Sequence, residues 1–508
     1  MVELQKNKKA NITVHLVDNP NKKIENKHTF LKVNYKSALT FDFSPMKIKR
    51  ESQKKLYGNY VKAGIGNFQN SYAEAFFNTR RSEKQSYGVY LKHTNLREGA
   101  IDARNSADAQ NKLVFSFQSF SKKGVFTGKV GLQQQQWHFY GYQRTDPIPA
   151  AKDIQQDFIT FEGQIGYTNK LEASKNYHDI GLFYHYWADR YAAKEQEIGG
   201  EFSKKINFNV NNKLFFKANV SSSMRSDEVG SIQRNLLNTE LYHQINYSKL
   251  YLQIGLRAAL HNDTLKEMEK AFLYPKLYLS FSLFKNKLDV FLQLDGGMQK
   301  RLMRDMVSEN PYLVANTPLL HTNKTWESSL GFRTKLANGI NWQASASYGF
   351  YQYLYFFMNS STFPSKFFVQ YETAITPVST FISEFSASFG KFRAKLCTEL
   401  QKYELKTLQS AWHRPLVKNT LSVGYSIEKF AINVDIYHLE GIKAFDVISS
   451  QQKDLQPITD VNMKIDYQFS PMWSVFAKGS NLLSQQYQRF LYYDARTAQV
   501  MAGASLTF

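Results

Sequence analysis

Histidine, cysteine and acidic residues would be the first side chains to suggest catalysis or metal binding, and their spacing in this chain supports neither. The eleven histidines form no His-x-x-x-His pair, and a strand would not present any Glu-x-x-His pair on one face as a metal site. Cys397 is the single cysteine, which excludes an intramolecular disulfide and a cysteine-rich zinc site. The sequence contains no nucleophile elbow, paired acidic motif or glycine-rich phosphate loop. We therefore expect a chain that is not an enzyme and has no resident metal or cofactor.

Charged side chains recur in the middle of segments that otherwise alternate between apolar and polar residues. In a membrane barrel such positions face the lumen, where charges set pore selectivity, hold an inward-folded loop, or form ladders that solvate and rigidify the wall. We expect two groups, one near Asp435 and one near Glu384. The expected lumen-facing charges are Arg257, Asp289, Arg393, Lys395, Glu399, Asp435, Lys464 and Asp466.

The elements that carry these charges are expected to be strands. A further strand is expected at the C-terminus and runs to the final residue. In "AQVMAGASLTF" the apolar side chains occupy every second position up to Leu506 and Phe508. Because successive side chains of a strand point to opposite faces, this strand has one apolar face and one polar or small-residue face. A terminus built wholly into a strand needs a structural reason, since chain ends usually fray.

The same alternation extends over most of the chain, and helical spacing is nowhere sustained. It recurs in "DVNMKIDYQF", "FAINVDIYHLE", "TLSVGYSIEK", "KLDVFLQLDG" and "LYLQIGLRAAL". No run approaches 18 apolar residues, so a transmembrane helix is excluded. Alternation alone fits both a soluble β-sandwich and a membrane barrel.

The connections distinguish these two folds. Tight links at 285–287, 338–339, 428–429 and 470–471 alternate with long polar ones at 95–110, 143–153, 302–323, 405–417, 442–456 and 485–497. Short periplasmic turns and long extracellular loops are typical of an outer-membrane barrel. We predict an all-β protein, a large transmembrane antiparallel up-and-down β-barrel of about 22 strands over residues 56–508. Closing it requires the last strand to pair with the first, because an open edge in hydrocarbon leaves backbone groups unpaired.

Aromatic residues make up 15% of the chain and gather toward the ends of the expected strands. The clusters "WHFYGY", "YQYLYFF" and "FLYYDAR" suit the girdles of rings that lie at headgroup level. The alternative is that these rings lie in loops or in a core.

The C-terminal segment "GSNLLSQQYQRFLYYDARTAQVMAGASLTF" resembles the end of TonB-dependent receptor barrels. The family motif is matched by Asn481, Leu482 and Leu483, with Tyr487 a few residues later. The resemblance implies an outer-membrane protein of a Gram-negative bacterium. It also implies that the closing strand, through Phe508 and Leu506, carries the signal read by the barrel-assembly machinery.

The N-terminal segment differs from that of the receptor family, whose members carry an N-terminal plug of well over a hundred residues with a TonB box. Residues 1–55 lack the length and the glycine-rich pattern of a plug, and they contain 13 Lys or Arg against 5 Asp or Glu. We expect a basic periplasmic or lumenal segment there, either a disordered tail or a segment that binds a partner or occludes the pore. The first twenty residues contain no secretory signal, so export requires one outside this sequence.

These observations leave two functions for the chain. The first is a plugless, receptor-like outer-membrane barrel, acting as a solute conduit or as the membrane component of an envelope complex. Its lumen would be wide, so we expect the N-terminal segment, inward loops or a partner to block it. The second is a soluble, secreted all-β protein that binds carbohydrate. The net charge of +21 suits outer-membrane lipid and lipopolysaccharide, and we expect other envelope proteins as partners but no nucleic acid.

Overall fold

The computed structural model describes residues 58–79, 82–144, 147–169, 176–263, 270–284 and 287–508. The predicted basic segment 1–55 and residues 285–286 of the predicted tight link 285–287 lie outside the described residues. The first described strand begins at Tyr60, close to the predicted start of the barrel.

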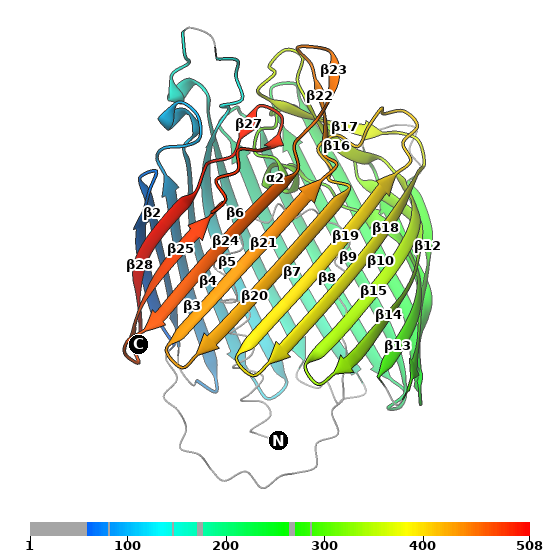
Figure 1. The fold of residues 1–508 in the computed structure, drawn as a ribbon. Coiled ribbons are helices and arrows are strands. Elements are labelled where there is room, and N and C mark those ends of the chain that lie inside the picture. The colour runs from blue at the N-terminus through cyan, green and yellow to red at the C-terminus, as the bar shows by residue number, and fades with distance from the viewer. Residues whose placement is uncertain (1–57, 80–81, 145–146, 170–175, 264–269, 285–286) are drawn as a thin grey trace.

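The described chain forms a closed antiparallel barrel of 22 strands, as predicted (Figure 1). Each strand pairs with its neighbours in chain order, apart from three short hairpins that belong to the loops. The barrel strands are β1 (Tyr60–Gly66), β2 (Asn70–Asn78), β3 (Gln85–Leu96), β4 (Asp108–Phe120), β5 (Gly124–His138), β6 (Gln155–Asn169), β7 (Asn176–Asp189), β8 (Lys194–Asn207), β9 (Asn212–Ser226), β10 (Ser231–Tyr247), β11 (Leu250–His261), β12 (Ala271–Leu283), β13 (Leu288–Gln299), β14 (Thr322–Ala337), β15 (Ile340–Gln352), β18 (Thr376–Phe389), β19 (Phe392–Tyr403), β20 (Val417–Ile427), β21 (Phe430–Glu440), β24 (Ile458–Gln468), β25 (Trp473–Ser480) and β28 (Gln499–Thr507).

The barrel closes where its first and last strands meet. β28 pairs with β1, and Leu506 is the register partner of Val61. Asn59 and Phe508 exchange backbone hydrogen bonds at 3.1 and 2.9 Å. This pairing removes the open sheet edge, which is why the chain is built as a strand up to its last residue.

The two ends of the barrel differ as the sequence predicts. The end at which Asn59 and Phe508 lie has short turns, such as Asn338–Gly339, where Gly339 takes the positive φ of 81° that a two-residue turn requires. Most connections at the other end are long and contain further elements (Figure 1). These are the short 3-10 helices η1 (Ala103–Ser106) and η2 (Ala151–Asp153), helix α2 (Met303–Glu309), and the hairpins β16 (Leu354–Asn359)–β17 (Phe367–Glu372), β22 (Lys443–Asp446)–β23 (Gln451–Asp454) and β26 (Gln488–Phe490)–β27 (Tyr493–Asp494).

The outer surface of the barrel is apolar. Leu91, Leu113 and Leu132 are register partners on neighbouring strands and are 41, 43 and 48% exposed. A soluble protein does not present leucines in rows around its outside, so the alternative of a soluble carbohydrate-binding protein does not fit this surface. No helix in the described part of the chain is long and apolar enough to span a membrane.

Candidate functional site

Five loops fold together over the extracellular mouth of the barrel, and we call them the lid. They are loop 139–154, of which 139–144 and 147–154 are described, and loops 300–321, 353–375, 404–416 and 481–498. Twenty-two tilted strands about 4.8 Å apart enclose a cylinder on the order of 40 Å across. A mouth of this width stays open unless loops from different sides meet above it.

Three tyrosines from three different sides of the barrel meet at the centre of the lid. The rings of Tyr312 and Tyr493 stack with centroids 3.5 Å apart, and Tyr140 packs edge-on against both at 5.9 and 4.7 Å. Eight strands (β6–β13) separate the loop of Tyr140 from that of Tyr312, and eight more separate the loop of Tyr312 from that of Tyr493. The remaining six strands are β28 and β1–β5, so the three loops leave the barrel at nearly even intervals. Their contact therefore spans the mouth.

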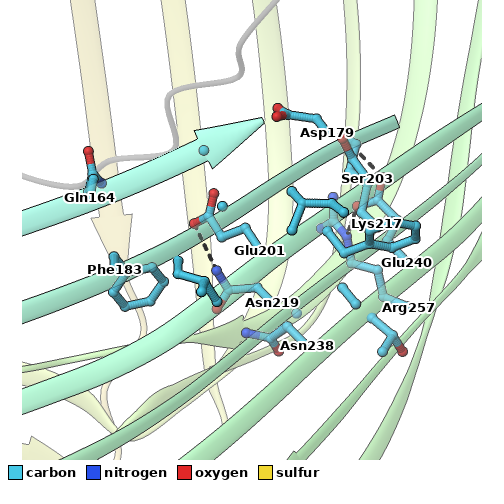
Figure 2. Close-up of a pocket in the computed structure, with 18 of the residues that line it drawn as sticks. Gln164, Asp179, Phe183, Glu201, Ser203, Lys217, Asn219, Asn238, Glu240 and Arg257 are labelled. Carbon is cyan, nitrogen blue, oxygen red and sulfur yellow. Dashed lines mark hydrogen bonds and ion pairs between the residues drawn. The ribbon is translucent and has the colours of Figure 1, made fainter. Parts of the chain in front are cut away.

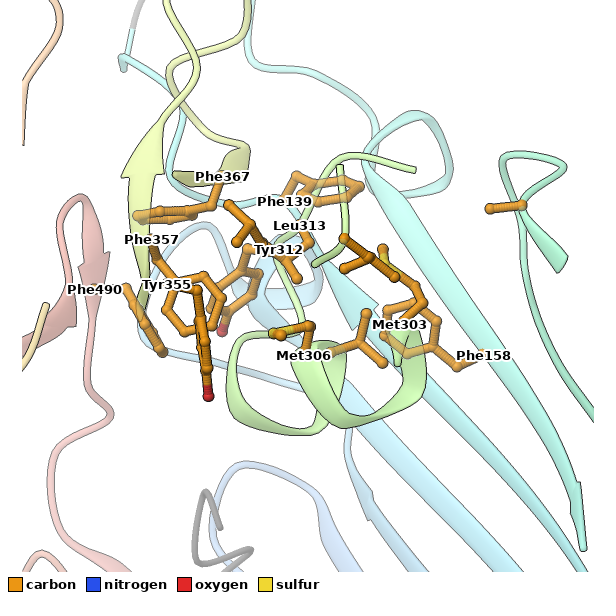
Figure 3. Packing of buried hydrophobic residues seen from close by; sticks show 14 of the residues in the cluster. Phe139, Phe158, Met303, Met306, Tyr312, Leu313, Tyr355, Phe357, Phe367 and Phe490 are labelled. Atoms are coloured by element: carbon orange, nitrogen blue, oxygen red, sulfur yellow. The ribbon is translucent and has the colours of Figure 1, made fainter. Parts of the chain in front are cut away.

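The lid has an apolar core of its own. Helix α2 contributes Met303, Met306 and Val307, at the i, i+3, i+4 spacing of one helix face. Figure 3 shows the rings of Phe357, Phe367 and Phe490 packed over this helix. The other buried residues of the core are Phe139, Phe158, Trp187, Ala193, Tyr312, Leu313, Leu319, Tyr355, Val369 and Tyr493.

This core corrects the prediction for the aromatic clusters. The clusters "WHFYGY", "YQYLYFF" and "FLYYDAR" contribute Phe139, Phe357, Phe490 and other rings to the lid core, and the three phenylalanines are at most 4% exposed. They do not form a lipid-facing girdle. The loops in which they lie turn inward, so the rings contact one another instead of headgroups.

A buried ion pair fastens helix α2 to loop 404–416. The Arg414 guanidinium pairs with the Glu309 carboxylate, and the Tyr355 hydroxyl donates to the same carboxylate at 2.6 Å. Glu309 and Arg414 are buried, and the guanidinium also lies over the Tyr355 ring. Burial alone would lower the pKa of Arg414, but the Glu309 carboxylate holds it above its usual value. The pair joins loop 300–321 to loop 404–416.

His413 connects three loops through hydrogen bonds. The Leu491 N–H donates to Nε2 at 3.2 Å, so Nδ1 carries the hydrogen and donates to the Phe357 carbonyl at 2.8 Å. Burial lowers the pKa of His413 to about 3; the hydrogen bond to the Phe357 carbonyl opposes this lowering, and the nearby positive charges of Arg489 and Arg414 add to it. The imidazole is therefore neutral at physiological pH.

Loop 300–321 is anchored on the barrel wall by charged side chains. The Glu195 carboxylate accepts hydrogen bonds from the backbone N–H groups of Met303 (2.9 Å) and Arg304 (3.4 Å), which satisfies the uncapped start of α2. Glu197 pairs with Lys300 and, at 2.6 Å, with Arg304. On the next two strands, the Arg225 guanidinium donates to the Ala315 and Thr317 carbonyls and that of Arg234 to the Arg301 carbonyl.

The carboxylate of Glu372 in β17 organises loop 404–416. It accepts hydrogen bonds from the Thr407 hydroxyl at 2.6 Å and from the backbone N–H groups of Thr407 and Leu408 at 3.0 Å. Burial alone would raise the pKa of Glu372, but these hydrogen bonds hold it below its usual value. The loop is thus ordered around a charge supplied by the neighbouring loop.

Beneath the lid, the wall of β5–β13 borders a hollow of about 640 Å³ (Figure 2). Arg257, one of the charges predicted from the sequence, donates to Glu240 and to Asp295, each at 2.6 Å. Lys276 lies 3.2 Å from Glu240, and Lys324 lies 3.5 Å from Asp295. The charges on this part of the wall alternate in sign and form a ladder.

The other predicted lumen charges lie on three further parts of the wall. Asp289 accepts a hydrogen bond from the Ser282 hydroxyl at 2.5 Å. Lys395 pairs with Glu384 at 2.9 Å, Glu399 is the register partner of Lys418, and Arg393 is exposed near the periplasmic end.

The group predicted near Asp435 is brought together only in part. Lys464 pairs with Asp466 at 2.7 Å, and Lys62 lies 4.0 Å from the same carboxylate. Asp435 instead accepts a hydrogen bond from the Ser422 hydroxyl at 2.6 Å. Sequence spacing did not indicate Lys62, because it lies some 400 residues away and reaches the group only through closure of the barrel.

The four motif residues have different environments. The Asn481 side-chain amide donates to the carbonyls of Gln485 (3.0 Å) and Arg496 (2.7 Å), and its backbone has a φ of 46°. The Tyr487 hydroxyl donates to Asp460 at 2.8 Å. The Leu482 N–H donates to the Val461 carbonyl, whereas Leu483 is 57% exposed.

The residues of the predicted assembly signal lie at the seam. Leu506 has Val61 and Trp473 as register partners on the two neighbouring strands. The Phe508 ring packs edge-on against Phe77, with centroids 6.4 Å apart. Both side chains hold the strand that closes the barrel.

The sequence did not indicate Glu309, His413 and Arg414, whose side chains join different loops of the lid. Each lies in a long polar segment, where nothing in the local pattern distinguishes a buried side chain from an exposed one. The available signal was the density of aromatic residues beside these segments, which indicates a core.

Comparison with known proteins places the fold. No protein-family model matches the sequence, and no curated protein matches it either. The structure is similar to the FrpB iron transporter from Neisseria meningitidis (F3-3 variant), with a TM-score of 0.69 at 10% identity, over 89% of this chain and 82% of that one. It is also similar to the siderophore receptor PirA from Acinetobacter baumannii, with a TM-score of 0.67 at 10% identity, over 89% and 80% of the two chains.

A third similar structure is the FpvAI–pyocin S2 complex, with a TM-score of 0.67 at 9% identity, over 90% of this chain and 74% of that one. At such low identity these comparisons establish the fold, and the outer-membrane location predicted from the sequence agrees with that fold. This chain therefore has the barrel fold of siderophore receptors and iron transporters, which confirms its predicted resemblance to TonB-dependent receptor barrels.

Proposed function

We propose that this protein is a solute conduit of the outer membrane that its own extracellular loops hold closed. The junction of Tyr140, Tyr312 and Tyr493 carries the proposal, because loops from three sides of the barrel meet there. A barrel that served only as a scaffold would not need a separate apolar core across a wide mouth. The barrel fold shared with iron transporters and siderophore receptors supports a transport role and a non-enzymatic one.

The proposal includes the absence of a plug, so that closure depends on the lid. In the receptor family the plug fills the lumen, whereas here buried contacts between loops span the mouth. The apolar outer surface of the barrel contacts the lipid of the membrane. We also propose that the protein contacts lipopolysaccharide in the membrane and the barrel-assembly machinery during its insertion.

Conductance across a planar bilayer tests the conduit. We expect the wild-type protein to conduct little, because the lid covers the mouth. The triple variant Tyr140→Ala, Tyr312→Ala, Tyr493→Ala removes the three rings and should give large, frequent openings.

The matched control removes three tyrosines from the outer surface instead. Tyr348, Tyr425 and Tyr467 are 41, 41 and 44% exposed there, and their replacement by Ala should leave conductance low. Large, constitutive conductance of the wild-type barrel would contradict closure by the lid. Low conductance of the triple variant would contradict an open path through the lumen beneath the lid.

A second function, as the membrane component of an envelope complex, is favoured by the β22–β23 hairpin. All four residues of β23 (Gln451–Asp454) are exposed, and the hairpin projects beyond the barrel (Figure 1). An exposed strand edge can pair with a strand of a partner. A tagged pull-down from detergent-solubilised outer membranes tests this, and recovery of partners in fixed ratio would favour it over a conduit that acts alone.

A further inference from the structure

A β-turn in the lid places a lysine among three aromatic rings, and we call these rings the ring cage. The turn "FPSK" lies between β16 and β17 and is closed by a hydrogen bond from the Lys366 N–H to the Phe363 carbonyl at 2.7 Å. Its second residue is a proline, which this position of a turn favours. The Lys366 Nζ lies 4.3 Å from the centroid of the Tyr191 ring, 4.6 Å from that of Phe139 and 5.3 Å from that of Phe363.

Two rings of the cage are held in place by contacts that do not involve the lysine. Phe139 is 2% exposed and belongs to the lid core. Tyr191, in the turn between β7 and β8, packs against Phe139 with centroids 5.9 Å apart, and its hydroxyl donates to the Gln155 carbonyl at 3.1 Å. Phe363 is 56% exposed, so the third ring lies at the surface and the cage can be reached from solvent.

The Lys366 ammonium lies against rings and forms no ion pair. No carboxylate of the described residues lies within 4.0 Å of its nitrogen. Burial lowers the pKa of Lys366, and the charge of Asp189 opposes this lowering from a greater distance. The Asp189 carboxylate accepts hydrogen bonds from two backbone N–H groups of its own turn, each at 2.8 Å. By contrast, Lys62 and Lys276 each lie over a ring and also have a carboxylate within 4.0 Å.

The turn that carries Lys366 is also joined to the tyrosine junction at the centre of the lid. The Tyr493 hydroxyl donates to the carbonyl of Ser365, the residue before Lys366. The Asn359 side-chain amide donates to the Pro364 carbonyl at 2.7 Å. Moving Lys366 out of the cage therefore moves a hydrogen-bond partner of the junction.

We propose that the ring cage binds a solute with an organic cation, a quaternary or primary ammonium group, which takes the place of the Lys366 ammonium. Aromatic faces attract cations, and cages of rings recognise quaternary ammonium groups. The rings give Lys366 no directional hydrogen bond, so they attract the ammonium of a solute in the same way. Displacing Lys366 separates the β16–β17 turn from loop 139–154 and loosens the lid. The inference rests on the proposed conduit function and names its substrate class.

Isothermal titration calorimetry of the purified full chain in detergent tests the site, with choline as the probe. The tethered Lys366 ammonium competes with choline at a high effective concentration, so we expect Lys366→Ala to bind choline at least roughly tenfold more tightly than the wild type. A purely structural role for Lys366 predicts no gain. The neutral analogue 3,3-dimethyl-1-butanol, in which carbon replaces the charged nitrogen, should bind far more weakly. No gain in Lys366→Ala, or equal binding of the neutral analogue, would overturn the inference.

Two further variants locate the site. Lys406→Ala removes the same charge from an exposed position of loop 404–416 and should keep the wild-type affinity. An equal gain in this control would assign the effect to net charge. Adding Phe363→Leu to Lys366→Ala removes one ring of the cage at an exposed position and should weaken choline binding several-fold. Unchanged affinity of this double variant would contradict binding in the cage.

A measurement on the wild type does not depend on how the variants fold. Choline should accelerate acylation of Lys366 by an amine-reactive ester, because the ammonium leaves the cage, whereas Lys406 should react at an unchanged rate. Mass spectrometry of the digested protein measures both, and unchanged labelling of Lys366 would contradict its displacement. Binding is measured without flux, so its failure leaves the conduit itself to be judged by conductance.

Discussion

At the residue scale, the lid depends on a few charged and polar side chains buried among aromatic rings. A buried charge without a partner is costly, so each such group must be matched by another loop. Glu309 with Arg414, and His413 with the Phe357 carbonyl and the Leu491 N–H, meet this requirement between loops far apart in sequence. These contacts give the lid a single arrangement, which apolar packing alone would not specify.

Breaking the buried ion pair should loosen the lid. Replacing Arg414 by Met removes the cation paired with the buried Glu309 carboxylate, at a cost of about 3–5 kcal/mol to the closed lid. We expect faster limited proteolysis of loops 300–321 and 404–416. Adding Glu309→Gln to Arg414→Met should restore much of the protection, because no charge then remains; equal protection of the wild type and Arg414→Met would show that the pair does not fasten the lid.

Acidification should loosen the same loops through His413. Its pKa of about 3 in the closed lid lies below the usual value of about 6.5 in an open one, so the open form binds the proton more tightly. The contribution is complete above pH 6.5 and is lost as pH falls toward 3, by up to about 1.4 kcal/mol per pH unit. Proteolysis with an acid-stable protease between pH 7 and 4 measures this.

The control for that prediction removes the titrating group. In His413→Gln the side chain stays neutral, so the part of the acid effect due to His413 should disappear, although the lid starts out looser. An identical pH profile for the wild type and His413→Gln would assign the effect to other groups.

At the element scale, β28 matters because it closes the barrel. Leu506 lies on the outer surface between Val61 and Trp473, so Leu506→Asp places a carboxylate in the lipid beside the seam. We expect a large loss of folded barrel from the outer-membrane fraction, measured by heat-modifiable migration. Ser505→Asp changes a neighbouring residue that faces the lumen and should assemble much better; equal loss in both variants would contradict the assigned faces.

The motif that follows β25 allows a matched comparison within three residues. Asn481→Ala removes both amide hydrogen bonds at a positive φ, at a cost of about 2–3 kcal/mol to loop 481–498. Leu483→Ala truncates an exposed side chain and should change stability by no more than about 0.5 kcal/mol. Urea unfolding in lipid vesicles measures both, and equal effects would contradict a structural role for the Asn481 amide.

At the scale of the whole molecule, the barrel and the lid are stabilised differently. Barrel strands are held by continuous backbone ladders in a medium without water, where opening one ladder exposes unpaired groups to lipid. The lid is held by side-chain packing and a few buried polar contacts. We therefore expect hydrogen exchange, followed by mass spectrometry, to be faster in the lid than in the β1–β28 seam, and Arg414→Met to accelerate the lid alone. Uniform acceleration would mean that lid and barrel open as one unit.

The sequence by itself determined the barrel. Alternation up to Leu506 and Phe508, sorted connection lengths and the need to close an edge are local or additive properties, and they indicated the fold, the seam and the approximate strand number. The sequence also indicated Asn481 and Tyr487, whose partners lie within or near the same loop region.

Only the tertiary structure decided how the lid and the lumen are built. The meeting of Tyr140, Tyr312 and Tyr493, the pairing of Glu309 with Arg414, and the approach of Lys62 to Asp466 join positions that are 100 to 400 residues apart. Closing the cylinder fixes which strands are neighbours and where each loop leaves the wall, and packing across the mouth then selects which loop residues are buried. Neither step produces a periodic pattern in the sequence. The aromatic clusters by themselves therefore indicate a girdle, whereas in the structure the loops turn inward and bury their rings.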